Sequence, residues 1–288
     1  MRLSAILVSL LAFSAFLRAG DTPAFPAPSE TKVVRELREI VARERDIWQY
    51  LRADPDNEEL KLRAEAEFRD VITAYENLLR SAPELAEGFA AYGLILSRTG
   101  NREAAVLALL RANKLDPRIA LVKNQLGNIL AEDGNYKEAL PYYLAAIELE
   151  PEEPLYHYQL GALLHEYRRL FIADGMYTDE TLTARSHDAF RRAAELAPDN
   201  WGYAYRFAES FYDSIRPDWD AALAEWRKLE ARAKPGLEVQ TVRLHIARVL
   251  VEADRYDEAR PILETITELV LQEHRQTVIE AIEAEAEK

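Results

Sequence analysis

Small and apolar residues recur along the chain at a constant spacing of 34 residues. Gly93, Gly127 and Gly161 follow this spacing. The same interval separates five further pairs, which are Gly100 and Gly134, Ala105 and Ala139, Ala112 and Ala146, Leu115 and Leu149, and Pro117 and Pro151. A single helix repeats its faces every ~3.6 residues. A shared interval of 34 residues therefore indicates a repeated structural unit rather than one helical face.

Each unit predicts two helices joined by a turn. The first helix carries an apolar residue followed by glycine, as in Leu126-Gly127. A glycine inside a helix costs up to ~1 kcal/mol relative to alanine, but its missing side chain lets a second helix pack closely. Gly134 can take the left-handed conformation that closes the first helix. Pro151 then ends the unit, because proline cannot continue a helix.

This pattern resembles the tetratricopeptide repeat family. The unit at 120–153 carries the family's residues Gly127, Gly134-Asn135-Tyr136, Ala139-Leu140, Tyr143, Ala146 and Pro151. The unit at 86–119 matches at Gly93, Ala105, Ala112 and Pro117. It departs from the family by placing Leu96 and Leu109 where aromatic residues are common. The resemblance implies an all-α, right-handed superhelical solenoid of antiparallel helix pairs, with helical capping segments at both ends.

About five such units are expected within residues 83–270. After 86–119 and 120–153, three further units follow at 154–200, 201–236 and 237–270. Residues 32–82 are interpreted as a degenerate helix pair and 271–288 as an acidic helix, which together cap the two apolar ends of the array.

The third unit is expected to carry thirteen extra residues, which fall within 170–183. Phe171, Ile172, Met176 and Tyr177 make this insertion unusually apolar for a loop. Long loops in compact folds are often functional, so the insertion is a second candidate surface. An extra turn of helix packed on a neighbouring unit is the favoured alternative.

The first residues predict export from the cytoplasm. Residues 3–17 carry no charge and follow Arg2, which fits a secretory signal better than the ~20 apolar residues that span a bilayer. We expect a signal peptide at 1–19, with an uncleaved membrane anchor as the alternative, and a Pro-rich linker at 20–31. The mature protein is then expected in the periplasm or outside the cell, with no membrane span.

Composition narrows the chemistry further. The chain has 36 Lys and Arg against 50 Asp and Glu, a net charge of −14, which disfavours nucleic acid as a partner. Its 49% hydrophobic content supports a large core. The sequence has no cysteine, which excludes a disulfide framework, thiolate metal sites and a cysteine nucleophile.

Catalytic motifs find little support. His165-Glu166 begins like the zinc motif H-E-x-x-H, but Arg169 stands where the second histidine is needed. His157 and His165 are eight residues apart, which is more than ~10 Å along a helix and too far to chelate one ion unaided. The sequence motifs of phosphate loops, dinucleotide-binding turns and serine elbows do not occur. We expect no catalytic residue, no metal and no cofactor.

The first helices of such repeats line the concave face of the array. Matching the family's groove positions to this sequence gives the candidate partner-binding residues Asn124, Asn128, Tyr158, His165, Tyr205, Glu209, Tyr212 and Arg248. The same mapping also places Leu94, Arg98, Glu132 and Leu244 on this face.

These residue types suit an extended peptide. Asn124 and Asn128 are four residues apart, so both amides can project from one helix face and bond a peptide backbone. Tyrosines supply the amphipathic contact area that is enriched at binding hot spots, although packing between repeats is an equal alternative for each of them. The carboxylate clamp of some family members is not expected, because its basic positions hold Leu121, Leu155 and Gln159.

The sequence thus predicts a non-catalytic scaffold or adaptor that is exported and binds a protein or peptide in its concave groove. One alternative is an accessory subunit or enzyme of cell-envelope polymer processing, with a site at His165, Glu166 and Glu209. Another is a structural self-assembly module.

Overall fold

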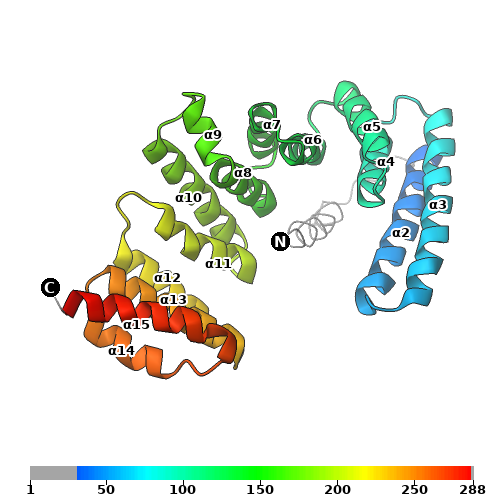
Figure 1. Ribbon diagram of the computed structural model, residues 1–288. Coiled ribbons are helices and arrows are strands. Elements are labelled where there is room, and N and C mark those ends of the chain that lie inside the picture. Colours follow the sequence, from blue (N-terminus) through cyan, green and yellow to red (C-terminus); the bar gives the residue numbers. More distant parts are fainter. Residues whose placement is uncertain (1–30, 287–288) are drawn as a thin grey trace, which may run out of the picture. The chain divides into compact units, whose positions relative to one another are not determined.

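The computed structural model describes residues 31–286, where every regular element is a helix (Figure 1). The chain divides into two compact units, an N-terminal unit up to Leu149 and a C-terminal unit from Glu150 onward. The expected signal peptide at 1–19 and almost all of the linker at 20–31 lie outside the described residues. No helix in 31–286 combines the length and the apolar character needed to cross a membrane.

The described part of the N-terminal unit consists of helix pairs. Helix α2 (Lys32–Ala53) packs on α3 (Glu58–Ser81), and α4 (Ala86–Arg98) packs on α5 (Arg102–Leu115). Helix α6 (Ala120–Glu132) packs on α7 (Tyr136–Leu149). Side-chain caps support the first pair, because Thr31 and Asn57 accept hydrogen bonds from the first-turn amides of α2 and α3.

The C-terminal unit repeats this plan with longer connections (Figure 1). Helix α8 (Pro154–Glu166) pairs with α10 (Asp179–Leu196), and the short α9 (Arg168–Ala173) lies between them in the chain. Helix α11 (Trp201–Ser210) continues into the 3₁₀ turn η2 (Phe211–Asp213) and packs on α12 (Trp219–Glu230). Helix α13 (Leu237–Glu252) packs on α14 (Tyr256–Glu264). After η3 (Leu269–Leu271), α15 (Gln272–Ala286) contacts both α13 and α14. The expected all-α class of paired helices is confirmed.

The insertion at 170–183 contains most of α9 and the first turn of α10. Phe171 is fully buried and makes an edge-on ring contact with Tyr177 at 5.9 Å. Leu170 and Met176 are exposed. One aromatic side chain therefore anchors the segment, and apolar residues beside it remain at the surface.

A left-handed residue closes three of the first helices. Gly134 has φ +78°, and its amide and that of Asn135 donate to Ala131 O and Leu130 O at 2.9 and 2.8 Å. Gly100 forms the same turn after α4. After α13 the place is taken by Asp254 at φ +57°. This bond pattern satisfies carbonyls that the helix end leaves free and sends the chain back along the first helix.

Glycines allow the two helices of a pair to approach closely. A methyl group added to Gly161 of α8 would lie 2.8 Å from the ring of Phe190 on α10, and one added to Gly93 of α4 would lie 2.7 Å from Leu109 on α5. Both neighbours are buried, at 1% and 0% exposed, so they cannot swing away. The spacing of 34 residues is thus the spacing of these helix contacts.

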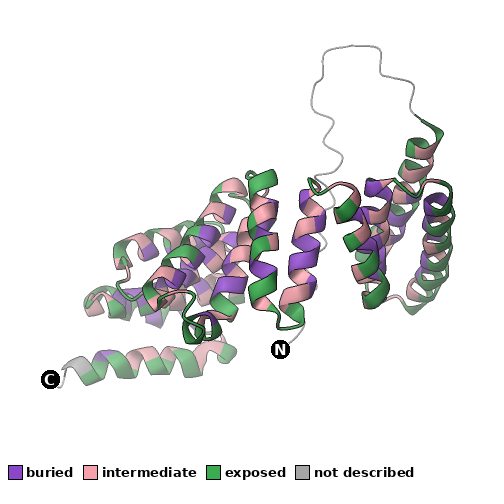
Figure 2. Ribbon diagram, turned by 90° about the horizontal axis from the view of Figure 1, so that it is seen from above, coloured by how far each residue is buried: buried purple, intermediate pink, exposed green. Residues whose placement is uncertain are grey.

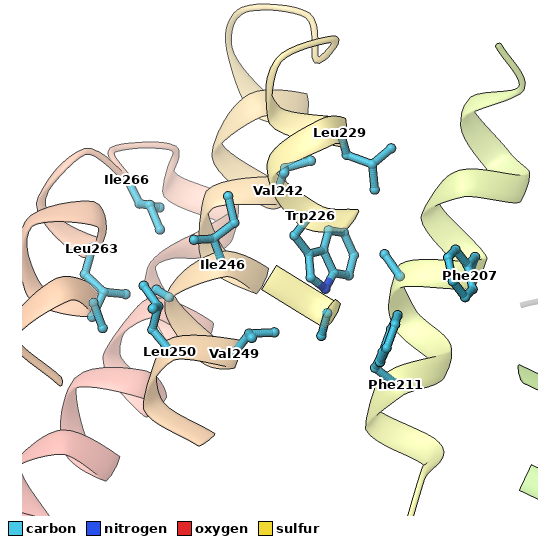
Figure 3. Close-up of a cluster of buried hydrophobic side chains, with 14 of the residues drawn as sticks. Phe207, Phe211, Trp226, Leu229, Val242, Ile246, Val249, Leu250, Leu263 and Ile266 are labelled. Atoms are coloured by element: carbon cyan, nitrogen blue, oxygen red, sulfur yellow. The ribbon is translucent and has the colours of Figure 1, made fainter. Parts of the chain in front are cut away.

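Buried residues gather on the facing sides of the helices within each unit (Figure 2). In the C-terminal unit they form a continuous cluster that includes Trp226, which is wholly buried, together with Phe207, Phe211, Ile246 and Leu250 (Figure 3). At ~25 cal/mol per Å² of buried apolar surface, such contacts are the main stabilising contribution. This cluster supports the inner ends of the groove residues described below.

A buried ion pair joins α2 to α4 in the N-terminal unit. The Glu44 carboxylate is 2% exposed and lies 3.3 Å from Arg98 Nη1. It also accepts hydrogen bonds from the Tyr75 hydroxyl at 3.1 Å and the Trp48 indole at 3.3 Å. Burial raises the pKa of Glu44, and Arg98 together with the two hydrogen bonds opposes that rise. Arg98 therefore pairs with Glu44 inside the N-terminal unit. This corrects the expectation that Arg98 lies on the open groove face.

Gly161→Ala tests the close approach of α8 and α10. We expect a loss of about 1–3 kcal/mol in the free energy of unfolding, because the new methyl group overlaps a fixed aromatic ring. The control is Gly202→Ala in α11, where the added group meets only Asn200 Oδ1 at 3.4 Å. Urea unfolding followed by tryptophan fluorescence compares them. Equal stability of the two variants would show that the contact does not constrain the helix pair.

Arg98→Met tests the buried ion pair. Removing one partner leaves a buried charge, so we expect a loss of about 3–5 kcal/mol at pH 7. Without Arg98 the pKa of Glu44 rises further, so the variant should recover part of this loss at pH 5. Arg63→Met removes the exposed pair with Glu67 and should cost less than ~1 kcal/mol. Thermal unfolding at both pH values separates these outcomes, and matching losses would contradict the burial argument.

Candidate partner-binding groove

The C-terminal unit holds six of the eight groove residues predicted from the sequence. Tyr158 and His165 come from α8, Tyr205 and Glu209 from α11, Tyr212 from η2 and Arg248 from α13. The six residues are half-buried or exposed. The three tyrosines among them also pack against the core of the unit, as the ring contacts of Tyr158 with Phe190 at 5.7 Å and of Tyr205 with Trp226 at 5.0 Å show. We refer to these six residues as the C-terminal groove.

His245 of α13 links the aromatic residues of the groove. Its ring stacks on Trp226 with 4.1 Å between centroids and 3° between planes. The Tyr205 hydroxyl lies 2.8 Å from His245 Nε2. Tyr212 reaches the same residue from η2, with its hydroxyl 3.4 Å from Nδ1 and 3.3 Å from the His245 carbonyl oxygen.

These bonds fit one neutral form of His245. The Tyr212 hydroxyl donates its proton to the backbone carbonyl, so its oxygen accepts from Nδ1–H. Nε2 then accepts the proton of Tyr205. Burial, with a smaller contribution from the charge of Arg248, lowers the pKa of His245 to about 4. The imidazole is therefore a neutral hydrogen-bonding hub near pH 7.

A second cluster surrounds Asp213 at the end of η2. Its Oδ2 lies 3.0 Å from His165 Nδ1 and 3.3 Å from Arg206 Nη2. Burial would raise the pKa of Asp213, but the hydrogen bonds and charges of His165 and Arg206 outweigh it and lower the pKa. Arg206 also lies over the Phe190 ring, 4.3 Å from its centroid. His165 and Arg206 are thus tied to one carboxylate.

Glu209 and Arg248 have no ion-pair partner among the described residues. The Arg248 guanidinium lies 4.4 Å from the centroid of the Tyr212 ring. Glu209 is half-buried on α11, and its burial raises the pKa of the carboxyl group, whereas Arg206 opposes the rise. The groove therefore presents one carboxylate and one guanidinium beside tyrosine rings.

A hollow of about 610 Å³ continues the groove between α13 and α15. His245 and Arg248 line it on the α13 side. Its apolar walls come from Leu244, Val251, Leu271 and Val278, and its polar groups include Thr241, His274 and Thr277. Leu244, which the sequence mapping assigns to the groove face, lines this hollow. Such a mixture of apolar walls and a few polar groups suits a peptide side chain or another small organic group.

The two predicted asparagines belong to the N-terminal unit. Asn124 is 0% exposed, and neither of its amide atoms has a hydrogen-bond partner among the described residues. The expectation that it projects from an open face is therefore wrong, because it lies one turn from the buried Ala120 and Gly127. Asn128 is half-buried, and its Oδ1 accepts a hydrogen bond of 2.7 Å from the Tyr143 hydroxyl.

The N-terminal unit has a smaller hollow of about 330 Å³ lined by α2, α4 and α6. Its walls are apolar and include Leu37, Val41, Leu94 and Leu121, with Arg38 and Glu87 at its edge. It lacks the tyrosines of the C-terminal groove, so the greater variety of binding groups lies in the C-terminal unit.

The described residues give no support to catalysis. His187 Nδ1 lies 2.8 Å from Ser210 Oγ, but this hydroxyl donates to Phe207 O at 2.6 Å and Ser210 is 2% exposed. The pair therefore cannot act as a nucleophile and base. Between residues 31 and 286 no group of His, Asp and Glu is arranged to hold a metal ion. His165 pairs with Asp213 rather than with Glu166 or Glu209.

His245 and Asp213 contact groove residues but were not among the predicted site residues. The sequence contained one signal for His245, because it adjoins Leu244 at a mapped groove position. Asp213 gave none, since it follows α11 in a 3₁₀ turn that the repeat does not contain.

Two segments match family models of this fold. Residues 127–166 match a TPR repeat model and residues 86–119 match a tetratricopeptide repeat model. This chain is a tetratricopeptide repeat protein, and its fold is that of a protein-interaction scaffold.

Solved structures share the fold at low sequence identity. One is pilF of Pseudomonas aeruginosa, with a TM-score of 0.56 and 18% identity, covering 88% of this chain and 100% of that chain. Another is YrrB, described as a TPR protein with an unusual peptide-binding site, with a TM-score of 0.56 and 17% identity over 74% of this chain and 98% of that chain. No curated protein matches the chain.

Acidification tests the neutral hub at His245. Its folded pKa of about 4 lies below the ordinary value of 6.5, so the unfolded chain binds the proton more readily. Its contribution to stability is therefore complete above pH 6.5 and decreases as the pH falls toward 4, by about 3 kcal/mol at 1.4 kcal/mol per pKa unit.

NMR titration of the imidazole signals measures this pKa directly, and the signal lost in His245→Gln identifies the residue. We expect a midpoint near 4 and a shallower acid dependence of stability in the variant. A midpoint near 6.5 would contradict the buried, neutral assignment.

Proposed function

We propose that the protein is an exported scaffold or adaptor that binds a protein or peptide partner in the C-terminal groove. The observation that carries this proposal is the gathering of tyrosines, Glu209 and Arg248 along the first helices of one unit. Tyrosine and arginine are enriched among residues that dominate binding energy. Tyr205 and Tyr212 are held by hydrogen bonds to His245, which lowers the entropy lost when a partner binds.

The hollow between α13 and α15 supports a partner that inserts a side chain. It continues the groove past Arg248 and has apolar walls with polar groups at intervals. A peptide can place an apolar side chain there while its backbone reaches Thr241 or Thr277. The peptide-binding site described for YrrB, which shares the fold, agrees with a groove of this kind.

Export rests on the charge-free stretch at residues 3–17 and the preceding Arg2. A signal of this kind would deliver the repeat array to the periplasm or the cell exterior. The absence of cysteine from the chain suits either place, because folding would not depend on disulfide formation.

Site-directed photo-crosslinking tests the groove assignment. A benzophenone amino acid replaces Arg248 in the groove, or Arg260 on the exposed side of α14 as the matched control. Each protein is produced in the native organism, illuminated, and purified from the envelope and culture fractions. We expect a discrete crosslinked partner from position 248 and none from position 260.

The same partner should bind purified Arg248→Ala about five- to tenfold more weakly than the wild type, since a hot-spot truncation costs about 1–2 kcal/mol. Arg260→Ala should bind normally. Crosslinks from position 260 alone, or unchanged affinity of Arg248→Ala, would place the partner on another surface.

A further inference from the structure

Glu209 is the one groove carboxylate whose surroundings are largely aromatic. It lies on α11, half-buried, and has neither a hydrogen bond nor an ion pair among the described residues. Half-burial of a charged group without a partner is unfavourable. The nearby carboxylate of Asp213, in contrast, is satisfied by His165 and Arg206.

Three tyrosines lie around this carboxylate. Tyr205 is one turn before Glu209 on α11, and Tyr212 follows three residues after it. Tyr158 approaches from α8 and packs on Tyr203 with 5.0 Å between ring centroids. Burial raises the pKa of all three tyrosines, and the negative charge of Glu209 adds to the rise at each of them.

The neighbouring cations are committed to other groups. Arg206 pairs with Asp213 and lies over Phe190, while Arg248 lies over Tyr212. Neither comes within ion-pair distance of Glu209. Asp213 partly offsets the attraction of Arg206 for Glu209, and the carboxylate keeps its hydrogen-bonding capacity for an incoming group.

We propose that Glu209, Tyr158, Tyr205 and Tyr212 form a subsite for a lysine or arginine side chain of the partner. The carboxylate supplies a charge-assisted hydrogen bond, and the rings of Tyr158 and Tyr205 attract a cation. Tyr212, which already holds Arg248 over its ring, contributes contact area. The acidic balance of the chain, −14, favours approach of a basic segment. This subsite rests on the proposed function, since it names the chemistry that the groove recognises.

A pair of short peptides tests the subsite without the natural partner. The probes are acetylated and amidated alanine pentapeptides with a central arginine or a central glutamine. The full chain carries ¹³C-labelled tyrosine rings, and their NMR shifts are followed during titration. We expect saturable shifts with the arginine peptide at a dissociation constant on the order of millimolar, and no saturable shift with the glutamine peptide.

Two variants that each remove one negative charge distinguish binding at the subsite from nonspecific attraction between the acidic protein and the basic peptide. Glu209→Gln should weaken the arginine peptide by about tenfold, the loss of one charge-assisted hydrogen bond. Glu264→Gln on the exposed surface of α14 should leave its affinity unchanged. Circular dichroism and the His245 imidazole signal report whether Glu209→Gln keeps the native fold. Equal shifts with both peptides, or undiminished affinity in Glu209→Gln, would overturn the proposal.

This subsite and the proposed function can fail separately. If position 248 crosslinks a natural partner that binds wild type and Glu209→Gln equally well, the basic subsite is wrong and the groove assignment stands. If the arginine peptide binds through Glu209 but no partner crosslinks at position 248, the subsite stands and the proposed role of the wider groove is wrong.

Discussion

The structure depends on the close contact between the two helices of each repeat. At Gly93 and Gly161 an added methyl group would overlap a buried side chain of the second helix. This contact fixes the rotation of the first helix about its own axis. Once that rotation is set, one side of the helix faces the core and the other faces the groove. The positions of Tyr158 and His165 therefore follow from this contact, because both lie within about one turn of Gly161 on α8.

Sequence periodicity predicted the paired helices because it records these helix contacts directly. The groove positions in the C-terminal unit could be mapped for the same reason, since helix rotation repeats with the unit. Depth of burial could not be obtained in this way. Asn124 lies at a position equivalent to groove residues, yet it is fully buried. A helical spacing gives the direction of a side chain and not the distance to its neighbours.

Long-range partners explain the other differences. Arg98 occupies a groove position in the repeat, but Glu44 binds it from α2, 54 residues earlier, in a segment where the repeat is degenerate. His245 receives its hydrogen bonds from residues 33 and 40 positions away. None of these separations equals 34 residues, so the repeat spacing does not reveal these contacts. Polar contacts between different repeats can be identified only from the structure. The apolar contacts within a repeat recur often enough to be recognised in the sequence.

Hydrogen–deuterium exchange of the full chain, with and without its purified partner, measures most directly which face of the C-terminal unit binds. We expect slower exchange on binding in α8, α11 and α13, and unchanged exchange in α10, α12 and α14. Protection confined to that second set of helices would contradict this expectation, because the partner would then occupy the opposite face of the C-terminal unit.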